Sequence, residues 1–482
     1  MGSLLVIAPV LVPAAAAGSY AVLGWNRITA WLGALSAAGL LACAIALATA
    51  GRSDALGGLL LSDALSAFML IVIGAVALLA MLASPAYLAT ELAHGHTGPR
   101  AMRRYGVLTQ SFIAAMALAV LASSLGLLWV AIEATTILTA FLVGHRRTRR
   151  ATEAAWKYVV ICSVGIALAL LGVVMVHYAG THAGVASLDW AVLAEHANRL
   201  DPGVMRIAVM LLVLGFGTKA GLAPMHAWLP DAHSQAPAPV SALMSGVLLS
   251  VAFYAILRVK VIADVALGAG FVRTLLVIVA LASLAVAASL LLGQRDYKRL
   301  LAYSSIEHMG LLALGAAIGN SLALVAVLLH ILGHGLGKSV LFLSAGQLHQ
   351  AVGSSRIHAV RGLTARAPLL AGAFSLGLLA LLGLPPFSLF ASELGIARAG
   401  FTAGLGWAVA LALVLMLVIV AAVGRHTRRM LLGGGESEAI ALPRSVAVPL
   451  VAGLAACAVL GITIWPLHSL LQAAATIAGA TP

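Results

Sequence analysis

Four ionisable residues interrupt long apolar stretches of the sequence. Glu133 lies in LLWVAIEATTILTAFLV, and Lys219 lies in VLGFGTKAGLAP. Lys338 lies in ILGHGLGKSVLFL, and Glu393 follows a proline pair in GLPPFSLFASE. A charged side chain near the centre of a bilayer costs several kcal/mol unless it is paired or hydrated. Because carboxyl and amino groups bind and release protons, these positions indicate proton transfer inside a low-dielectric interior.

Each of these residues also has a structural explanation that the sequence leaves open. Glu133 could belong to an ion pair that only packs helices, and Lys219 could extend its ammonium group to the membrane surface. Glu393 lies near the end of its apolar stretch and could be an interfacial acid. Asp63, at the start of another apolar stretch, is expected to be interfacial rather than a proton carrier.

Three titratable residues share one predicted helical face, because His330, His334 and Lys338 are spaced by four residues. Each step of four turns a helix by only about 40° beyond a full turn, so the side chains follow one face over roughly 12 Å. Imidazole, with its near-neutral pKa, both accepts and releases protons, so the stripe is typical of a hydrated proton path. Glu307 and His308, in the preceding apolar stretch, are candidates to join it, although adjacent residues point to different sides.

A pair formed by Glu133 and Lys219 would act as a switch. Burial disfavours the charged form of either group, whereas an opposite charge nearby favours it. A pair that forms and separates would therefore change Lys219 between holding and releasing its proton. The energy must come from outside the chain, because the sequence contains no phosphate-binding loop with lysine and no redox ligand set. Since Cys43, Cys162 and Cys457 lie singly, we expect no metal site and no bound cofactor.

The composition indicates that lipid surrounds these residues. Hydrophobic residues make up 62% of the 482 residues and charged residues 9%, which is unlike a water-soluble domain. The net charge of +13 comes mainly from Lys and Arg in short connections, as expected of topology signals, so nucleic-acid binding is not expected. No polar stretch is long enough to build a second core. We therefore predict a single membrane domain over residues 1–482.

Apolar runs of about 20 residues, the length that crosses a hydrocarbon core, predict an all-α integral membrane protein with about fourteen transmembrane helices. Helices are required because open backbone cannot face lipid. The predicted spans cover residues 3–23, 28–50, 58–83, 107–125, 126–144, 157–178, 204–223, 240–260, 271–292, 301–318, 321–349, 368–391, 401–424 and 445–465.

Cationic residues cluster in alternate connections between these spans. These connections carry Arg27, then Arg100, Arg103 and Arg104, then Arg146, Arg147, Arg149 and Arg150, then Arg295, Lys298 and Arg299, then Arg356, Arg361 and Arg366, then Arg425, Arg428 and Arg429. By the positive-inside rule they face the cytoplasm, and both termini then lie outside. Arg258 and Lys260 are the main exception. The first apolar stretch lacks a basic segment before it, so we expect a retained span rather than a cleaved signal peptide.

Prolines interrupt two of the predicted spans. Pro224 interrupts the seventh span, and Pro385 and Pro386 interrupt the twelfth. Paired broken helices are typical of transporters built from repeats. We therefore predict two five-helix units, spans 4–8 over residues 107–260 and spans 9–13 over residues 271–424. An odd number of helices per unit makes the repeat inverted, although isolated proline kinks are also common in membrane helices.

Several motifs together resemble a known family. The segment TKAGLAPMHAWLPDAHSQAPAPVSALMSG at 218–246 closely resembles the central motif of the proton-conducting antiporter-like subunits of respiratory complex I, its hydrogenase relatives and multisubunit Na⁺/H⁺ antiporters. Further matching segments are WVAIEATT at 129–136, QRDYKRLLAYSSIEHMG at 294–310, HILGHGLGKSVLFLSAGQL at 330–348 and LGLPPFSLFASE at 382–393. The resemblance covers about residues 105–395 and implies a fold of fourteen helices.

The resemblance implies roles for individual residues. Glu133 matches the family's fifth-span glutamate, and Lys219 matches its seventh-span lysine. Lys338 is similar to the central lysine of the eleventh span. Glu393 is similar to the acid of the twelfth span that passes protons to the exit side.

Two histidines and one serine complete this comparison. His226 and His233 resemble the histidines that follow the broken helix, although hydrogen bonds in the local turns would also explain them. Ser250 is a departure, because some relatives carry a lysine or histidine in the eighth span where GVLLSVAFYAILR has this serine. The intermediate carrier is then absent, or is replaced by water near Ser250 and His334.

The resemblance also implies partners and a location. AIEATT, EAAWKYVVICSVGIALALLG and IEHMG are most similar to the hydrogenase 4 or formate hydrogenlyase type. Such a subunit works with other membrane subunits and a peripheral redox arm of iron–sulfur and, in hydrogenases, nickel–iron subunits, in a bacterial or archaeal plasma membrane. Redox chemistry in those partners would drive proton transfer. The sequence leaves open a Na⁺/H⁺ antiporter or inorganic-carbon uptake subunit without redox chemistry, and a purely structural membrane scaffold.

Overall fold

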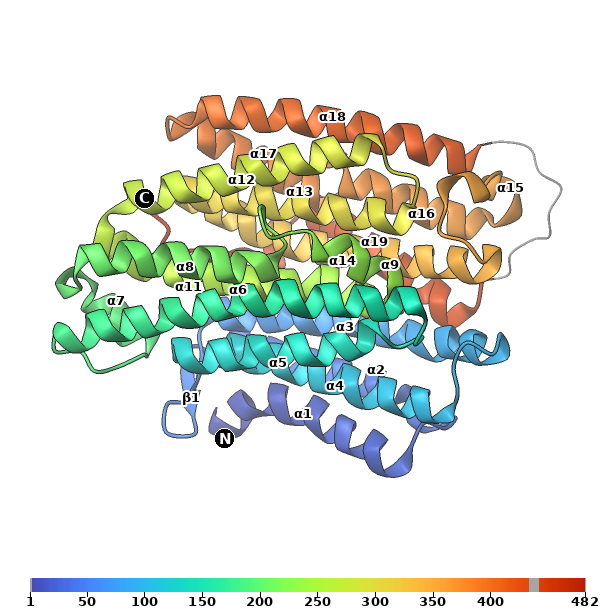
Figure 1. Ribbon diagram of the computed structural model, residues 1–482, viewed down its shortest axis with the longest axis horizontal. Helices are drawn as coiled ribbons and strands as arrows, with labels where there is room; N and C mark the ends of the chain where they lie inside the picture. Colours follow the sequence, from blue (N-terminus) through green and yellow to red (C-terminus); the bar gives the residue numbers. More distant parts are fainter. Residues whose placement is uncertain (1, 433–441, 482) are drawn as a thin grey trace.

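The computed structural model describes residues 2–432 and 442–481. In this part of the chain the helices run roughly parallel to the longest axis and form one bundle (Figure 1). Thirteen of the described helices are long and apolar enough to cross a membrane. They are α1 (Gly2–Leu23), η1 with α2 (Thr29–Ala50), α3 (Ala64–Ala93), α4 (Pro99–Leu121), α5 (Leu125–Val143), α6 (Arg149–His182), α8 (Pro202–Ala220), α10 with η3 and α11 (Ala238–Leu267), α12 (Ala269–Leu292), α13 (Tyr297–Ile318), α14 (Ser321–Val352), α18 (Gly406–Leu431) and α19 (Arg444–Ile462).

The remaining elements are short. The apolar helix α16 (Pro368–Leu381) and the following α17 (Ser388–Thr402) together correspond to the twelfth predicted span, 368–391, and bring the thirteen spans to fourteen. The others are β1 (Ser53–Ala55), β2 (Leu60–Ser62), α7 (Trp190–Glu195), η2 (Ala197–Arg199), α9 (Trp228–Gln235), η4 (Ile357–Ala359), α15 (Leu363–Arg366), η5 (Trp465–Leu467) and α20 (His468–Ile477). The prediction of an all-α, multi-pass membrane protein is therefore confirmed.

The third span begins and ends later than predicted. Residues 53–62 form the antiparallel hairpin β1–β2, and α3 begins at Ala64. The helix starts there because Asp63 and Ser66 form a capping box: the Asp63 carboxylate accepts the Ser66 N–H, and the Ser66 hydroxyl accepts the Asp63 N–H. At its other end α3 continues to Ala93, ten residues beyond the predicted limit of 83, and so brings Glu91 to the bundle's end.

Both predicted helix breaks are present. Helix α8 ends at Ala220, where Gly221 takes a left-handed conformation (φ 77°), and α9 resumes at Trp228. Likewise α16 ends at Leu381, before the proline pair, and α17 starts at Ser388. Proline has no N–H for the helical ladder and its ring crowds the preceding turn, which favours a break at both points. In each proposed five-helix unit a long helix, α6 or α14, precedes the broken span; the inverted repeat itself stays a prediction.

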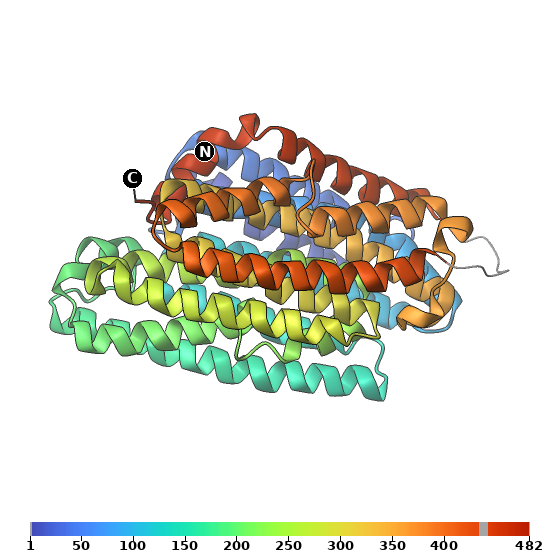
Figure 2. The ribbon, with the colours of Figure 1, turned by 90° about the horizontal axis from the view of Figure 1, so that it is seen from above.

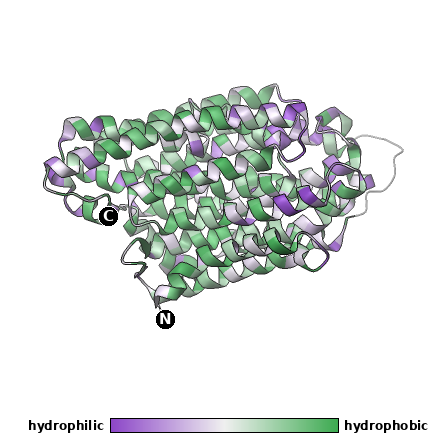
Figure 3. Cartoon of the chain, turned by 60° about the horizontal axis from the view of Figure 1, so that its bottom comes forward, coloured by the Kyte–Doolittle hydropathy of each residue, from purple (hydrophilic) through white to green (hydrophobic). Residues whose placement is uncertain are grey.

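Burial differs strongly among the spans. The most apolar window of Ala238–Leu267 is 100% buried, and those of α13 and α14 are 94% buried, whereas those of α1 and α18 are only 33% buried. Figure 3 shows hydrophobic residues over most of the bundle, with hydrophilic ones gathered mainly toward its ends. The helices that carry His308 and Lys338 are therefore, with the eighth span, among the most buried in the bundle.

Both chain ends lie at one end of the bundle, opposite α15 (Figures 1 and 2). We refer to the end that contains Arg146 and α15 as the arginine-rich end. At the other end, Arg258 is only 2% exposed and its Nη2 donates to both carboxylate oxygens of Asp63 at 2.7 and 2.8 Å, while Lys260 donates to Asp264 at 2.5 Å. These two exceptions to the charge asymmetry are thus neutralised inside the protein.

Candidate proton pathway

Lys219 is fully buried in the last turn of α8. Its ammonium nitrogen donates to Thr136 Oγ1 at 2.9 Å and to the hydroxyl of Tyr158. The Tyr158 hydroxyl in turn shares a hydrogen bond of 2.5 Å with Thr139. The helix end is held by Trp228, whose indole N–H donates to the Thr218 carbonyl at 2.8 Å. Lys219 is therefore fixed among hydroxyl groups, and no carboxylate lies within 4.0 Å of it in the described part of the chain.

Glu133 lies on α5, three residues before Thr136. Residues three apart on a helix are neighbours, so Glu133 lies one turn from the hydroxyl that binds Lys219. Its Oε2 is buried and has no hydrogen-bond partner among the described protein atoms. The structure thus places the predicted pair close together but not in contact, and the switching role of Glu133 stays a prediction.

Lys338 is likewise fully buried, in the eleventh span, α14. Its ammonium nitrogen donates to the Leu301 carbonyl at 2.7 Å and to Ser304 Oγ at 2.5 Å, both on α13. Its hydrogen-bond partners are again neutral oxygen atoms. Glu307, also on α13, is buried with 4% of its surface exposed.

A chain of histidines continues from Lys338 along α14. His334 packs against His308 of α13 with ring centroids 5.0 Å apart. His308 Nδ1 lies 3.0 Å from His330 Nε2, and His330 Nδ1 lies 2.9 Å from Ser392 Oγ on α17. The stripe on α14 therefore meets a histidine from a second helix and a serine from a third. All three histidines are fully buried.

Glu393 follows Ser392 on α17 and marks the end of this chain of groups. Its carboxylate lies against Gly383, where an added Cβ would be 2.0 Å from Oε2. Gly383 also has a left-handed backbone (φ 63°), so this turn both needs glycine and leaves room for the acid. Glu393 lines a cavity of about 440 Å³ between α13, α17 and α18.

The same region contains a set of donors that fits a metal ion. Ligand atoms of His308, His330 and Glu393 all lie within 4.8 Å of one another. Two imidazoles and a carboxylate are the donor types that zinc prefers. Sequence reasoning expected no metal site, because these residues come from three separate helices and show no ligand spacing.

Several other buried polar groups have no hydrogen-bond partner among the described protein atoms. His233 is fully buried, stacks on Phe342 with centroids 4.9 Å apart, and has both ring nitrogens unpaired in the described structure. Two further atoms have no hydrogen-bond partner in the described structure: Oγ of the buried Ser250 and Nδ1 of the half-buried His226. Ser245 and Ser305 share a hydrogen bond of 2.8 Å. Since buried polar groups are costly unless hydrogen-bonded, we expect water molecules to connect them.

The eighth and eleventh spans touch backbone to backbone beside these groups. A Cβ added at Gly246 would lie 3.0 Å from the Gly335 carbonyl oxygen, and one at Gly335 would lie 2.9 Å from that of Gly246. Gly246 lies in a π-helical turn, Met244–Leu248, and such turns are frequent at functional sites. The eighth and eleventh spans are therefore in direct main-chain contact at these two glycines.

A separate charged cluster closes the arginine-rich end. Glu91, 2% exposed, accepts two hydrogen bonds from Arg146 at 2.9 and 2.7 Å and one from Gln350 at 3.1 Å. Arg146 also lies 3.0 Å from His349. Next to it, burial and the neighbouring Arg104 cation lower the pKa of His145, in the connection after α5, to about 4. The hydrogen-bonding groups of Glu91 and Arg146 are occupied by each other and by Gln350 and His349. We therefore assign this cluster a structural role, in which it holds the helix ends together.

Sequence reasoning missed the hydroxyl groups of the site. Thr136 follows Glu133 by one helical turn in the EATT motif, a spacing that would have identified it. Tyr158, Ser304 and Ser392 reach the lysines and histidines from other helices, so no local pattern connects them. Asp63, expected at an interface, is a helix cap and the partner of Arg258.

The bundle and its buried row of titratable side chains define a class: polytopic membrane subunits that conduct ions through their interior. A family model described as NADH:quinone oxidoreductase/Mrp antiporter, TM, matches residues 122–419. The chain is also 39% identical to a hydrogenase-4 component F homolog of Methylacidiphilum infernorum over 381 residues, 78% of this chain and 79% of that protein. The chain therefore belongs to the NADH:quinone oxidoreductase/Mrp antiporter membrane family, as its motifs predict.

Solved structures show the same fold. One subunit of an archaeal respiratory complex, the membrane-bound sulfane sulfur reductase, superposes with a TM-score of 0.88 at 24% identity and covers 99% of this chain and 98% of its own. A subunit of respiratory complex I from Thermus thermophilus gives a TM-score of 0.82 at 25% identity, with 99% and 100% covered. Both similarities extend over the whole bundle.

Proposed function

We propose that this chain is the proton-translocating subunit of a redox-driven membrane complex related to hydrogenases and NADH:quinone oxidoreductases. Protons move through both five-helix units, and the energy comes from electron transfer in partner subunits. The route uses the buried titratable residues Glu133, Lys219, His226, His233, Glu307, His308, His330, His334, Lys338 and Glu393, with water near Ser250.

The observation that carries this proposal is the environment of the two lysines. Lys219 and Lys338 are both fully buried, and each ammonium nitrogen is bound by neutral oxygen atoms. A hydroxyl group can accept a hydrogen bond from an ammonium ion and can donate one to a neutral amine. Each lysine can therefore gain or lose its proton without breaking a salt bridge, as a relay requires and a structural ion pair does not.

Glu133 is the group that changes how strongly Lys219 holds its proton. Two opposite unit charges 4 Å apart attract by about 4 kcal/mol at an effective dielectric constant of 20. That energy corresponds to roughly a thousandfold change in the ratio of protonated to neutral amine. Movement of Glu133 toward Lys219 would thus favour protonation of the lysine, and movement away from it would favour release of the proton.

The histidine chain carries the proton onward from Lys338. Imidazole binds a proton on one nitrogen and releases one from the other, so the hydrogen bond between His308 and His330 is a relay step. His334 packs on His308 without a hydrogen bond to it, so a proton from His334 passes to His308 through water. Ser392 orients His330, and Glu393 accepts the proton beside its cavity.

We also propose the setting in which this takes place. The relatives' names include a hydrogenase-4 component, a sulfane sulfur reductase and complex I, and these support partnership with other membrane subunits. We propose that the partners also include a peripheral arm with iron–sulfur subunits. For a hydrogenase-4 or formate hydrogenlyase type, this arm would also contain nickel–iron subunits. The membrane would be a bacterial or archaeal plasma membrane, with the arginine-rich end in the cytoplasm and both termini outside.

The test uses the assembled complex isolated in mild detergent and reconstituted in vesicles with a pH-sensitive dye. Lys219→Ala and Glu133→Gln should each abolish most coupled proton movement, while electron transfer to an artificial acceptor continues. Lys157→Ala is the matched control, because Lys157 lies beside Tyr158 on α6 but is 49% exposed and paired with Glu153. Normal pumping in both test variants would reject the assigned roles.

A second candidate function follows from the family description, which includes Mrp antiporters. An antiporter subunit would exchange protons for Na⁺ without an electron donor. Vesicles given a Na⁺ gradient and no donor distinguish the two: donor-independent proton movement would favour the antiporter. The proteins that copurify with the chain give an independent answer.

A further inference from the structure

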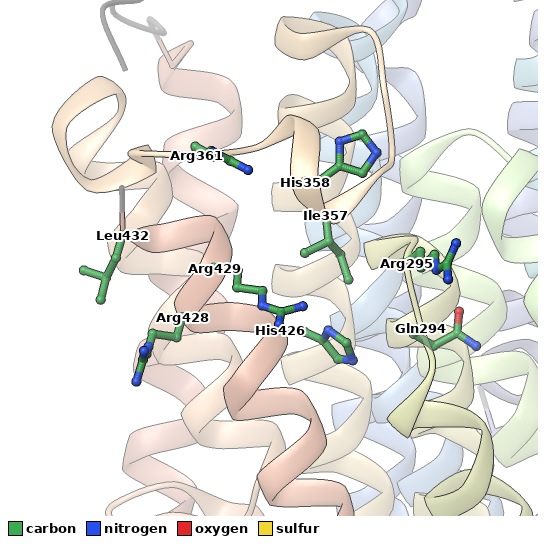
Figure 4. Close-up of a pocket in the computed structure, with 9 residues that line it drawn as sticks. All are labelled: Gln294, Arg295, Ile357, His358, Arg361, His426, Arg428, Arg429 and Leu432. Atoms are coloured by element: carbon green, nitrogen blue, oxygen red, sulfur yellow. The ribbon is translucent and has the colours of Figure 1, made fainter. Parts of the chain in front are cut away.

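A hollow of about 730 Å³ opens at the arginine-rich end, away from the proton pathway (Figure 4). Three segments form its walls: the connection after α12, the segment from η4 toward α15, and the last turns of α18. Its cationic lining consists of Arg295, Arg361, Arg428 and Arg429, with His358 and His426 beside them. No acidic side chain of the described residues lines it.

The walls of the hollow are held in place by hydrogen bonds between α18 and the end of α12. His426 Nε2 lies 3.2 Å from the Leu291 carbonyl oxygen, and Arg425 donates to the Leu292 carbonyl at 3.0 Å. These carbonyls belong to the unpaired last turn of α12, so the contacts also cap that helix. Figure 4 shows Arg361 and Arg429 directed into the space between these segments, whereas Arg428 is directed away from them.

In the described part of the chain, these arginines lack a counter-charge. Within residues 2–432 and 442–481, none of the four forms a salt bridge. Like charges gathered in one hollow repel, and guanidinium groups bind phosphate oxygens in pairs. The chemistry of the lining thus calls for a multivalent anion such as a phosphate group.

Apolar surface leads directly to these arginines. Leu290 and Leu292, in the last turn of α12, are 39% and 48% exposed, and Leu432 in the wall itself is 59% exposed. Lower on α18, which packs against α12, Leu417 is 69% exposed. A ligand that combines a phosphate with long apolar chains matches this surface better than a free anion does.

We propose that the hollow binds the headgroup phosphate of an anionic phospholipid, whose acyl chains lie along α12 and α18. Basic pockets between helix ends on the positively charged side of membrane proteins commonly bind such headgroups. The site would hold one lipid molecule where α12 and α18 meet. This proposal does not depend on the proposed proton transfer.

The test measures lipids retained by the purified full chain. Protein from nanodiscs of phosphatidylcholine mixed with phosphatidylglycerol or cardiolipin is analysed by native mass spectrometry. Arg361→Gln and Arg429→Gln should each lower anionic-lipid retention by about tenfold, since each removes one charge-assisted contact. Arg27→Gln and Arg100→Gln are controls, because these arginines lie at the same end outside the hollow. Melting temperatures verify that all variants are folded.

Three results would overturn the proposal. One is equal retention by the hollow variants and the controls. A second is complete displacement of the lipid by millimolar inorganic phosphate, which would make the site one for free phosphate. The sequence between Leu432 and Leu442 contains Glu436 and Glu438, outside the described residues. The third result concerns these two acids. If replacing both with Gln strongly increased lipid retention, carboxylates of the chain itself would occupy the hollow in place of a lipid phosphate. Unchanged retention supports the lipid.

Discussion

The substitution Tyr158→Phe tests the environment of Lys219 most directly. It removes the hydroxyl that accepts from the ammonium group and bonds Thr139, and it keeps the ring that lies 4.7 Å from the lysine nitrogen. Thr136 remains as a hydrogen-bond acceptor. Hydrogen bonds to charged groups contribute about 1.5–3 kcal/mol, so the amine should hold its proton roughly 10- to 100-fold less tightly.

We expect this variant to pump protons about tenfold more slowly at neutral pH and to recover partly at lower pH, where proton supply restores the ammonium form. The measurement is dye-monitored acidification of vesicles containing the assembled complex, normalised to electron transfer. Tyr178→Phe is the control, because Tyr178 lies on the same helix but is 53% exposed. If Tyr158→Phe pumped at the parental rate at every pH, the hydroxyl environment of Lys219 would have no part in proton transfer.

Three further predictions concern other parts of the molecule. Asp63→Asn keeps the helix cap but leaves Arg258 buried without its counter-charge, which should cost about 3–5 kcal/mol and clearly lower the melting temperature; an unchanged value would contradict the pairing. Ser392→Ala removes the partner of His330 and should slow proton transfer up to about tenfold, whereas unchanged transfer would exclude that contact from the relay. Zn²⁺ should bind the purified chain and inhibit pumping reversibly, and His330→Ala should abolish the binding measured by elemental analysis; equal binding would place the metal elsewhere.

The architecture could be predicted from sequence because lipid imposes simple rules. Apolar length set the number of spans, and prolines located both broken helices. Boundaries were less accurate: α3 starts at Ala64 rather than 58 because a capping box, not hydrophobicity, begins the helix. Arg258 looked like an exception to the charge rule because its partner, Asp63, is 195 residues away.

The candidate site was predictable only in part, for a related reason. Charged residues in apolar spans are conspicuous, so Lys219 and Lys338 could be selected without any structure. Hydroxyl groups are common in membrane helices, and nothing in the sequence marks Tyr158 or Ser304 among them. Their roles depend on how α6 packs on α8 and α13 on α14, which tertiary contacts decide.

The contact between Gly246 and Gly335 has a mechanical consequence. The two main chains meet without side chains between them that could change rotamer to accommodate a displacement. A tilt of the eighth span must therefore displace the eleventh. Movement that starts near Lys219 would then reach the histidines as a rigid shift, without a continuous row of charges to carry it.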